Sequence, residues 1–542
     1  MKKLLRLIPV TICALFLVGS AYGQQLKVTG HVKDATSGDP LPGVDILVVG
    51  TTIGTTTGSN GEYTINVKSS TDTLRFSYIG YTSKNVPVRG RTTINVELQP
   101  KVFKSNQLVV VGYGTQKRSD LTGAISSVSS KSLQQETIST PDQALQGKVA
   151  GVMVHTNSHA PGGSITVQVR GTSSISANGQ PLYVIDGMPI SNDYFTGGEG
   201  TGGGGGAPNP LNSIDPSDIA SIQVLKGPSA AAIYGSRAVN GVVLITTKEG
   251  QRGAQHVNFE SSFGIQHIKK YLPLMNAQQW AKQLNEAASQ FGEGQAFSSQ
   301  KISAMGSGTN WQKQLYRTAP TDKYKLSFSG GTNNLQYLVS GVYLNQEGIV
   351  RGTNFKRYST NINIHANVNK NLTIGDNLMF TASTNNLNSS SYKGYGTQPD
   401  IIKEALIAPP NVTPYDSAGN PTLYSTYPLG LAGPKNELEN PLEMAYNYHQ
   451  VGNVMRIIGN VHADWTILPN LDLKARLGSD VRDFRYHQYF PIGSLAAGGS
   501  NGRASESSDR TINILNEETL TYQKSINNDN HVKVLVGYSY QQ

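Results

Sequence analysis

The chain has 542 residues, a formal net charge of +9 and 58 glycines, and charged residues make up 15% of it. The length exceeds that of a single ordinary domain, and abundant glycine with few charges is typical of a turn-rich β protein rather than of a disordered one. The positive charge is dispersed and forms no basic run interleaved with aromatic residues, so nucleic acid is not an expected partner.

The N-terminus, residues 1–23, has the pattern of a secretory signal peptide. Lys2 begins a basic start that precedes a mostly apolar stretch, and the small residues Ala21 and Gly23 predict cleavage after Gly23. The only cysteine, Cys13, lies inside this segment, so the mature chain is expected to form no disulfide. No later apolar run is long enough for a transmembrane helix, and a soluble periplasmic or secreted protein is one reading of the chain.

Residues 24–100 predict a small all-β sandwich. Short β-branched runs such as GEYTINV and TTINVEL alternate with turn signals, among them Asn60 and Gly61. His31 is not accompanied by a zinc-binding set of His and Glu residues here. No metal or peptidase site is therefore expected in this domain.

Residues 101–114 combine a linker with a short apolar segment. The segment is apolar on both faces of a strand and is then interrupted by glycines. Its residues are Leu108, Val109, Val110, Val111, Gly112, Tyr113 and Gly114. An extended strand with free edges can add to the sheet of a partner, where main-chain hydrogen bonds provide affinity. A plain linker strand packed on the following domain is the alternative.

Residues 115–250 contain three motifs in order, QALQGKVAGVMV, PLYVIDGMPI and VLKGPSAAAIYGSRAVNGVVLITTK. The third motif reads as a strand, a tight turn, a helical turn, a second loop and a buried strand, with glycines where the chain reverses. Asp186 and Gly187 lie between apolar runs and predict a hairpin turn rather than a ligand or a nucleophile. The motif residues to which we assign a structural role are Asp186, Gly187, Lys226, Gly227, Tyr234, Gly235, Arg237, Asn240 and Gly241.

Together these motifs resemble the plug domain of TonB-dependent outer membrane receptors, in the form found in the SusC/RagA family, and we call residues 115–250 the plug. The runs LPGVDILVVGTTIGTTTGSNGEYTI and LRFSYIGY resemble the carboxypeptidase regulatory-like domain that opens many chains of that family. The resemblance implies that residues 108–114 are the TonB box. It also implies that Lys226 and Arg237 bind the plug to the barrel wall rather than to substrate.

Other candidate sites in the plug are weak. The glycine tract at 196–206 is followed by no GK[ST] sequence, so it predicts a flexible loop rather than a phosphate-binding loop. His155 and His159 have i,i+4 spacing, but a strand flanks them and no Glu lies between them, which argues against zinc. Asp215 and Asp218 predict turn and N-cap residues rather than an acid pair. We therefore expect no catalytic residue, metal or cofactor.

From residue 251 to 542, long segments alternate in polarity. Val461 and Ala463 share an apolar face of one segment, while His462 and Asp464 share its polar face. In a soluble sandwich the apolar face would be the core, whereas in a membrane barrel it faces lipid and the polar face lines a wet lumen. Strand length, and connections that alternate between long and short, favour the barrel. We predict about nine strands, near 257–267, 322–330, 335–347, 355–368, 371–384, 453–467, 471–486, 508–522 and 530–542.

Two features fit the barrel less well. The segment at 508–522 alternates poorly, and Asp376 falls on an otherwise apolar face. Barrels with plugs of this type use about 22 strands, so about nine strands predict an incomplete barrel. We expect the chain to be an N-terminal portion of a mainly β protein with a β-sandwich, an α+β plug and part of a large transmembrane antiparallel barrel.

The resemblance implies import through the outer membrane of a Gram-negative bacterium, with the N-terminal domain and plug on the periplasmic side, the barrel in lipid and no enzyme activity. A nutrient, an oligosaccharide in preference to a peptide, would bind beneath a SusD-like surface lipoprotein. TonB, driven by the inner-membrane proton gradient, would then pull on the box. A single-component siderophore or cobalamin-type receptor and a non-transporting surface adhesin or scaffold are the alternatives.

Overall fold

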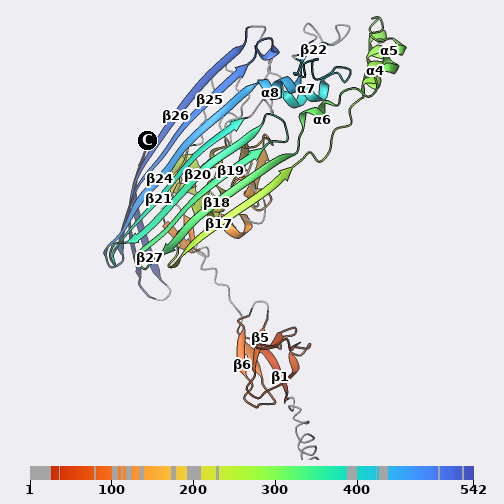
Figure 1. The fold of residues 1–542 in the computed structure, drawn as a ribbon. Helices are drawn as coiled ribbons and strands as arrows, with labels where there is room; N and C mark the ends of the chain where they lie inside the picture. Colours follow the sequence, from red (N-terminus) through yellow and green to blue (C-terminus); the bar gives the residue numbers. More distant parts are fainter. Residues whose placement is uncertain are drawn as a thin grey trace, which may run out of the picture. The chain divides into compact units, whose positions relative to one another are not determined.

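The chain forms two compact units, one up to Gln107 and one from Leu108 onward, and Figure 1 shows their elements in a computed structural model. Both units are mainly β, as the sequence predicts. The predicted signal peptide, Gly112, Tyr113 and the glycine tract lie outside the described residues. The structure describes residues 26–35, 37–78, 81–99, 108–111, 114–117, 125–133, 139–171, 179–191, 209–227, 231–386, 400–422, 424–426, 437–497, 501–527 and 530–542.

The first unit is the predicted β-sandwich. A three-stranded sheet in the order β4-β1-β7 and a four-stranded sheet in the order β3-β2-β5-β6 enclose one apolar core that includes Val32, Ile46 and Phe76. Burial alternates residue by residue along β4, as expected when one face of a strand packs inward. The strands are β1 (Leu26–Asp34), β2 (Asp45–Val48), β3 (Gly54–Thr56), β4 (Glu62–Val67), β5 (Thr73–Ser77), β6 (Lys84–Pro87) and β7 (Val96–Leu98).

The predicted apolar segment at 108–114 begins with a strand. β8 (Leu108–Val111) pairs antiparallel with β9 (Gly114–Lys117), with Leu108 opposite Lys117. Leu108–Val111 is therefore extended, as predicted. One of its two edges is occupied by the chain's own next strand.

The plug contains a mixed five-stranded sheet in the order β10-β15-β16-β13-β14, in which β13 and β16 run parallel. Asp186 and Gly187 form the predicted two-residue hairpin turn between β13 and β14, with φ of 47° and 86°, the positive values that such turns require. The strands are β10 (Ile125–Ser129), β11 (Val152–Thr156), β12 (Ile165–Val169), β13 (Leu182–Ile185), β14 (Met188–Pro189), β15 (Ile219–Leu225) and β16 (Val242–Thr247). The helices are α2 (Ser130–Leu133), η2 (Gln143–Leu145), η3 (Pro210–Ser213), η4 (Pro216–Asp218) and η5 (Ala232–Ala238).

The rest of the second unit is dominated by nine consecutive antiparallel strands in one sheet, which we call the long sheet. Each strand in the described chain pairs with the next one along, so the nine predicted strands are confirmed. They are β17 (Gly253–Gln266), β18 (Ala319–Gly331), β19 (Leu335–Glu347), β20 (Asn354–Asn367), β21 (Leu372–Asn386), β24 (His449–Leu468), β25 (Leu471–Phe490), β26 (Arg503–Ser525) and β27 (His531–Gln541).

The two ends of the long sheet differ. Short connections such as 332–334 and 469–470 lie at one end, and the helices of the long connections gather at the other (Figure 1). This alternation matches the prediction. The long connections contain α4 (Ala277–Gln290), α5 (Ser299–Ala304), α6 (Trp311–Leu315), α7 (Ile401–Ile407), β22 (Tyr424–Thr426), β23 (Glu437–Glu439), α8 (Pro441–Asn447) and η7 (Leu495–Ala497).

The long sheet is apolar on its outward face and polar on its inward face, the face that lies against the plug. Val461 is 50% exposed, whereas Arg456 and Asn460 on the opposite face are 3% and 4% exposed. The predicted sidedness of this strand is therefore confirmed. In a water-soluble sheet the apolar face would instead be covered.

The poor alternation at 508–522 has a packing explanation. Ile512 and Ile514 point outward and are more than half exposed, while Leu515 points inward and is 2% exposed. Leu515 belongs to the apolar core of the plug, together with Ile458 and Met379 of neighbouring strands. An inward residue has to be apolar wherever the wall touches that core, and this interrupts the sequence pattern.

In the part of the chain that the structure describes, no helix combines the length and the apolar character needed to cross a membrane.

Candidate functional site

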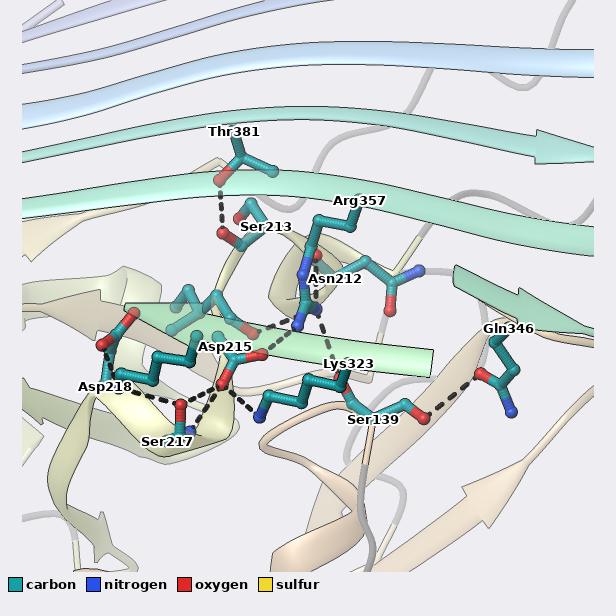
Figure 2. A network of polar contacts seen from close by, with 12 residues as sticks. Ser139, Asn212, Ser213, Asp215, Ser217, Asp218, Lys323, Gln346, Arg357 and Thr381 are labelled. Atoms are coloured by element: carbon teal, nitrogen blue, oxygen red, sulfur yellow. Dashed lines mark hydrogen bonds and ion pairs between the residues drawn. The ribbon is translucent and has the colours of Figure 1, made fainter. Parts of the chain in front are cut away.

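The plug meets the long sheet through a cluster of buried charges that we call the interlock (Figure 2). Its plug residues lie on and beside the short helix η4, and its sheet residues lie on the inward face of β18, β19 and β20. The interlock consists of Asp215, Ser217, Asp218, Lys323, Lys325, Ser340 and Arg357.

Local sequence positions the two plug carboxylates. Asp215 is followed by Pro216, and its side chain caps η4 by accepting a hydrogen bond from the Ser217 backbone N–H at 2.8 Å. The Asp218 N–H closes the turn onto the Asp215 carbonyl at 3.0 Å. The predicted turn and N-cap roles are therefore confirmed, but they are not the whole role of either carboxylate.

Asp215 lies between two cations of the long sheet. The distance from Arg357 Nη2 to Asp215 Oδ2 is 2.5 Å, and that from Lys323 Nζ to Oδ1 is 2.8 Å. Lys323 and Arg357 are aligned across the sheet because both pair with Leu344 of β19. Burial alone would raise the pKa of Asp215, but Arg357 and Lys323 hold it well below its usual range.

Arg357 is buried completely, with a side-chain exposure of 0%. Besides its ion pair, its Nη1 donates to the backbone carbonyls of Ser139, Asn212 and Ile214 at 3.1 to 3.3 Å. A guanidinium can satisfy several acceptors at once because its donors form a rigid planar fork. Arg357 therefore ties two separate segments of the plug to one strand of the sheet.

Asp218 forms the second half of the interlock. Lys325 Nζ lies 2.6 Å from Asp218 Oδ1, and Ser340 donates to the same oxygen at 2.8 Å. Lys325 also reaches Ser217 Oγ at 2.9 Å. Among the described residues, every ion pair between plug and sheet belongs to Asp215 or Asp218.

Further along the sheet the contacts with the plug are weaker. Arg456 and Asp480, on β24 and β25, form a buried two-point ion pair within the sheet at 2.7 and 2.8 Å. From this pair Arg456 donates to the Pro210 carbonyl at 3.1 Å, and Asp480 accepts from the Ser191 N–H at 3.3 Å. The plug side supplies only backbone groups to these two residues, so the contacts are hydrogen bonds with one charged partner and not ion pairs.

The structure corrects the expectation for Lys226. We expected Lys226 to bind the plug to the wall, but its Nζ donates to Ser126 Oγ and to the Ala150 carbonyl, both at 2.9 Å and both within the plug. Lys226 directly follows β15, which pairs with β10, and this places Ser126 within its reach. Arg237 does contact the wall, through the side chain of Gln541.

Other motif residues make contacts within the plug. Asp186 accepts from the backbone N–H and the hydroxyl of Thr247 at 2.9 and 2.8 Å. Burial raises the pKa of Asp186 to about 6, although both hydrogen bonds oppose the shift. Tyr234 is buried in a small apolar cluster, and Asn240 donates to the Gln180 carbonyl at 3.3 Å. Gly235, with φ of 65°, and Gly241, with φ of 86°, need the left-handed conformation.

His155 lies in strand β11, which excludes the helical spacing that a zinc pair would need. In the described stretches of the chain, no group of three or more His, Cys, Asp or Glu side chains could hold a metal ion.

At the helical end of the long sheet, α6, α7 and α8 share an apolar core with η7. Glu404 of α7 is only 5% exposed at this place, and its Oε2 makes no hydrogen bond within the described residues. Burial raises the pKa of Glu404 to about 7; Lys403 opposes this shift, and the carboxylates of Glu439 and Asp400 add to it. The helical end therefore contains a carboxyl group that titrates near neutral pH.

We expect this helical end to lose stability as the pH rises from about 4.5 to 7, because unfolded Glu404 ionises more readily than the buried group. The stability is fully present below the unfolded pKa and lost above the folded one. Glu404→Gln should flatten this dependence, and Glu286→Gln, at an exposed position of α4, should not. Hydrogen exchange of residues 400–412 at pH 5.5 and 8.5 measures the effect. Equal pH dependence in wild type and Glu404→Gln would contradict it.

Comparisons with known proteins agree with this architecture. A family model described as the TonB-dependent receptor plug domain matches residues 117–242, and a CarboxypepD_reg-like domain model matches residues 28–110. The second match extends into the apolar segment at 108–114.

Among curated relatives, "TonB-dependent receptor P3" of Formosa agariphila is 33% identical over 97% of this chain and 49% of its own length. "TonB-dependent receptor SusC" of Bacteroides thetaiotaomicron is 32% identical over 89% of this chain and 47% of its own. A solved structure of the RagAB peptide importer in its "open-open" state superposes with a TM-score of 0.66 and 28% identity, over 80% of this chain and 49% of that one. The chain thus spans about half the length of these relatives.

Proposed function

The chain belongs to the TonB-dependent receptors of the SusC/RagA type, which are outer membrane proteins, and from that premise we propose that it serves in TonB-driven import of a nutrient. One observation carries the proposal. The long sheet is apolar outside and polar inside, and the plug is fixed against the polar face by buried ion pairs. A wall that faces lipid, together with an internal stopper, is the arrangement that gated passage requires.

Residues 108–114 are the proposed TonB box, the segment that TonB would bind and pull. Leu108–Val111 is extended, and an extended segment can add to a partner sheet through its main chain. About ten residues further on, β10 lies at the edge of the plug sheet and pairs only with β15 in the described chain. Force applied at the box by TonB would pass through β9 to β10, the first strand of the plug sheet along the chain, and no covalent chemistry is involved.

The proposed cargo is an oligosaccharide that binds beneath a SusD-like surface lipoprotein. The short connections of the long sheet would face the periplasm, as such turns do in outer membrane barrels, and its helical end would face outward toward the lipoprotein. A peptide is the second candidate cargo, because the superposed RagAB structure is that of a peptide importer.

The test uses Val110→Pro in the whole receptor, in its own outer membrane. Proline removes a backbone N–H and fixes φ, so addition of the segment to a partner sheet should fail. Cells receive a pool of neutral oligosaccharides or a pool of peptides, and mass spectrometry measures which pool is depleted from the medium. We expect TonB-dependent depletion to fall at least about tenfold, with binding at the cell surface retained.

Val110→Ile is the matched control, because it keeps the N–H and the extended preference. It should deplete the pool at the wild-type rate. Undiminished uptake by Val110→Pro would exclude residues 108–114 as the TonB box.

A further inference from the structure

A polar cavity of about 560 Å³ lies between the plug and the long sheet, near the short connections. Its plug side is formed by the Asp186–Gly187 turn and by β16, and its wall by strands from β20 to β27. Lys370 and Asn371, in a short connection, belong to its rim. The volume lies within the range of about 300–1,000 Å³ that is typical of small-molecule sites.

The lining of this cavity is nearly balanced in charge. Its lining residues include four Lys or Arg, five Asp or Glu (among them Asp376 of the outward face) and ten Asn, Gln or Thr. The amide and hydroxyl groups can both donate and accept hydrogen bonds. Such a lining suits an uncharged molecule that carries many hydroxyl groups better than it suits an anion or a cation.

Two polar atoms of the lining residues have no hydrogen-bond partner among the described residues. Nε of Arg476 and Nδ1 of His462 are buried and make no hydrogen bond within the described part of the protein. The ring of His462 lies against Gly375, where even a Cβ atom would come within 2.2 Å of it. Buried polar groups of this kind normally have a partner; neither atom is accessible from the cavity as it stands, so each would reach a ligand only after the plug moves.

The plug is held more loosely beside the cavity than at the interlock. Arg476 Nη1 donates to the Gly187 carbonyl at 3.3 Å, and Asn460 donates to the Asp186 carbonyl at 3.4 Å. Both are long hydrogen bonds, and Asn377 donates to the hydroxyl of Thr247 at 3.0 Å. No ion pair joins plug and wall here among the described residues, whereas those of the interlock measure 2.5 to 2.8 Å. The cavity borders neither β18 nor β19, so the interlock and the cavity share only β20.

We propose that this cavity is an exit-side binding station for uncharged oligosaccharide units, opened when the Asp186–Gly187 turn moves away from Arg476. This proposal rests on the proposed import function and names a site where the cargo binds on its way to the periplasm. The interlock holds the plug against β18 and β20, and cargo passes along the β24–β26 wall. Sugar hydroxyls would pair with Arg476 and His462 during transit.

The test fills the cavity without touching the interlock. Thr521 of β26 lines the cavity, while its neighbour Leu520 points outward and is 39% exposed. In the whole receptor, Thr521→Trp should lower the TonB-dependent depletion of the neutral oligosaccharide pool at least about tenfold and leave surface binding unchanged. Leu520→Trp, the same change one residue away, should stay within about twofold of wild type.

If Thr521→Trp does not assemble, Thr521→Cys is labelled with a bulky thiol reagent after assembly; Cys13 is the chain's sole native cysteine. Loss of uptake after labelling supports the station. Wild-type uptake with the cavity filled or labelled overturns it and leaves the import function standing. TonB-dependent depletion of charged peptides but not of neutral sugars overturns the ligand class. If the wild-type receptor depletes neither pool in a TonB-dependent way, the import function fails, and the station with it.

Discussion

Asp215→Asn will destabilise the docked plug by about 3–5 kcal/mol, the usual cost when one partner of a buried ion pair is removed. Arg357, with 0% side-chain exposure, would keep its charge without the carboxylate that neutralises it. Lys323 would lose the same partner. The measurement is hydrogen exchange of residues 209–219 in the whole receptor, and we expect exchange about a hundredfold to about five thousandfold faster.

Asp322→Asn is the matched control for this experiment. Asp322 precedes Lys323 on β18 and forms no ion pair among the described residues. The double variant with Arg357→Gln should be less destabilised than Asp215→Asn alone, because the fully buried guanidinium is then removed and only Lys323, whose side chain is 18% exposed, is left without its carboxylate. Additive effects of the two substitutions would show that Asp215 and Arg357 do not act as a pair.

Val461→Arg will be costly for a different reason. Val461 is 50% exposed on the outward face of β24, and an arginine that faces lipid near the membrane midplane costs about 2–4 kcal/mol. Val461→Leu keeps the apolar character and should be nearly neutral. Urea unfolding of the receptor in lipid vesicles measures the difference between the two variants.

Labelling provides the independent check. A cysteine at 461 should react with a lipid-soluble reagent and resist an aqueous one. If aqueous reagent labels position 461 while Val461→Arg is as stable as Val461→Leu, the outward face of the sheet does not meet lipid. The alternation would then have been assigned to the wrong environment.

The sequence by itself determined the elements and their faces. Strands from β17 to β27 follow from alternation with a period of two, which is a local property of the chain. The turn at Asp186 and Gly187 and the cap at Asp215 are local in the same sense, since each depends on residues within a few positions.

Only the tertiary structure decided what these faces meet. Asp215 and Arg357 are 142 residues apart in sequence, and their pairing depends on where the plug docks and on the register that aligns Lys323, Leu344 and Arg357. The same docking places Leu515 against the plug core, where the polar pattern breaks. Lys226 stays within the plug because Ser126 is brought to it by strand pairing. Contacts of this kind depend on distances between remote segments, and local periodicity carries no information about those distances.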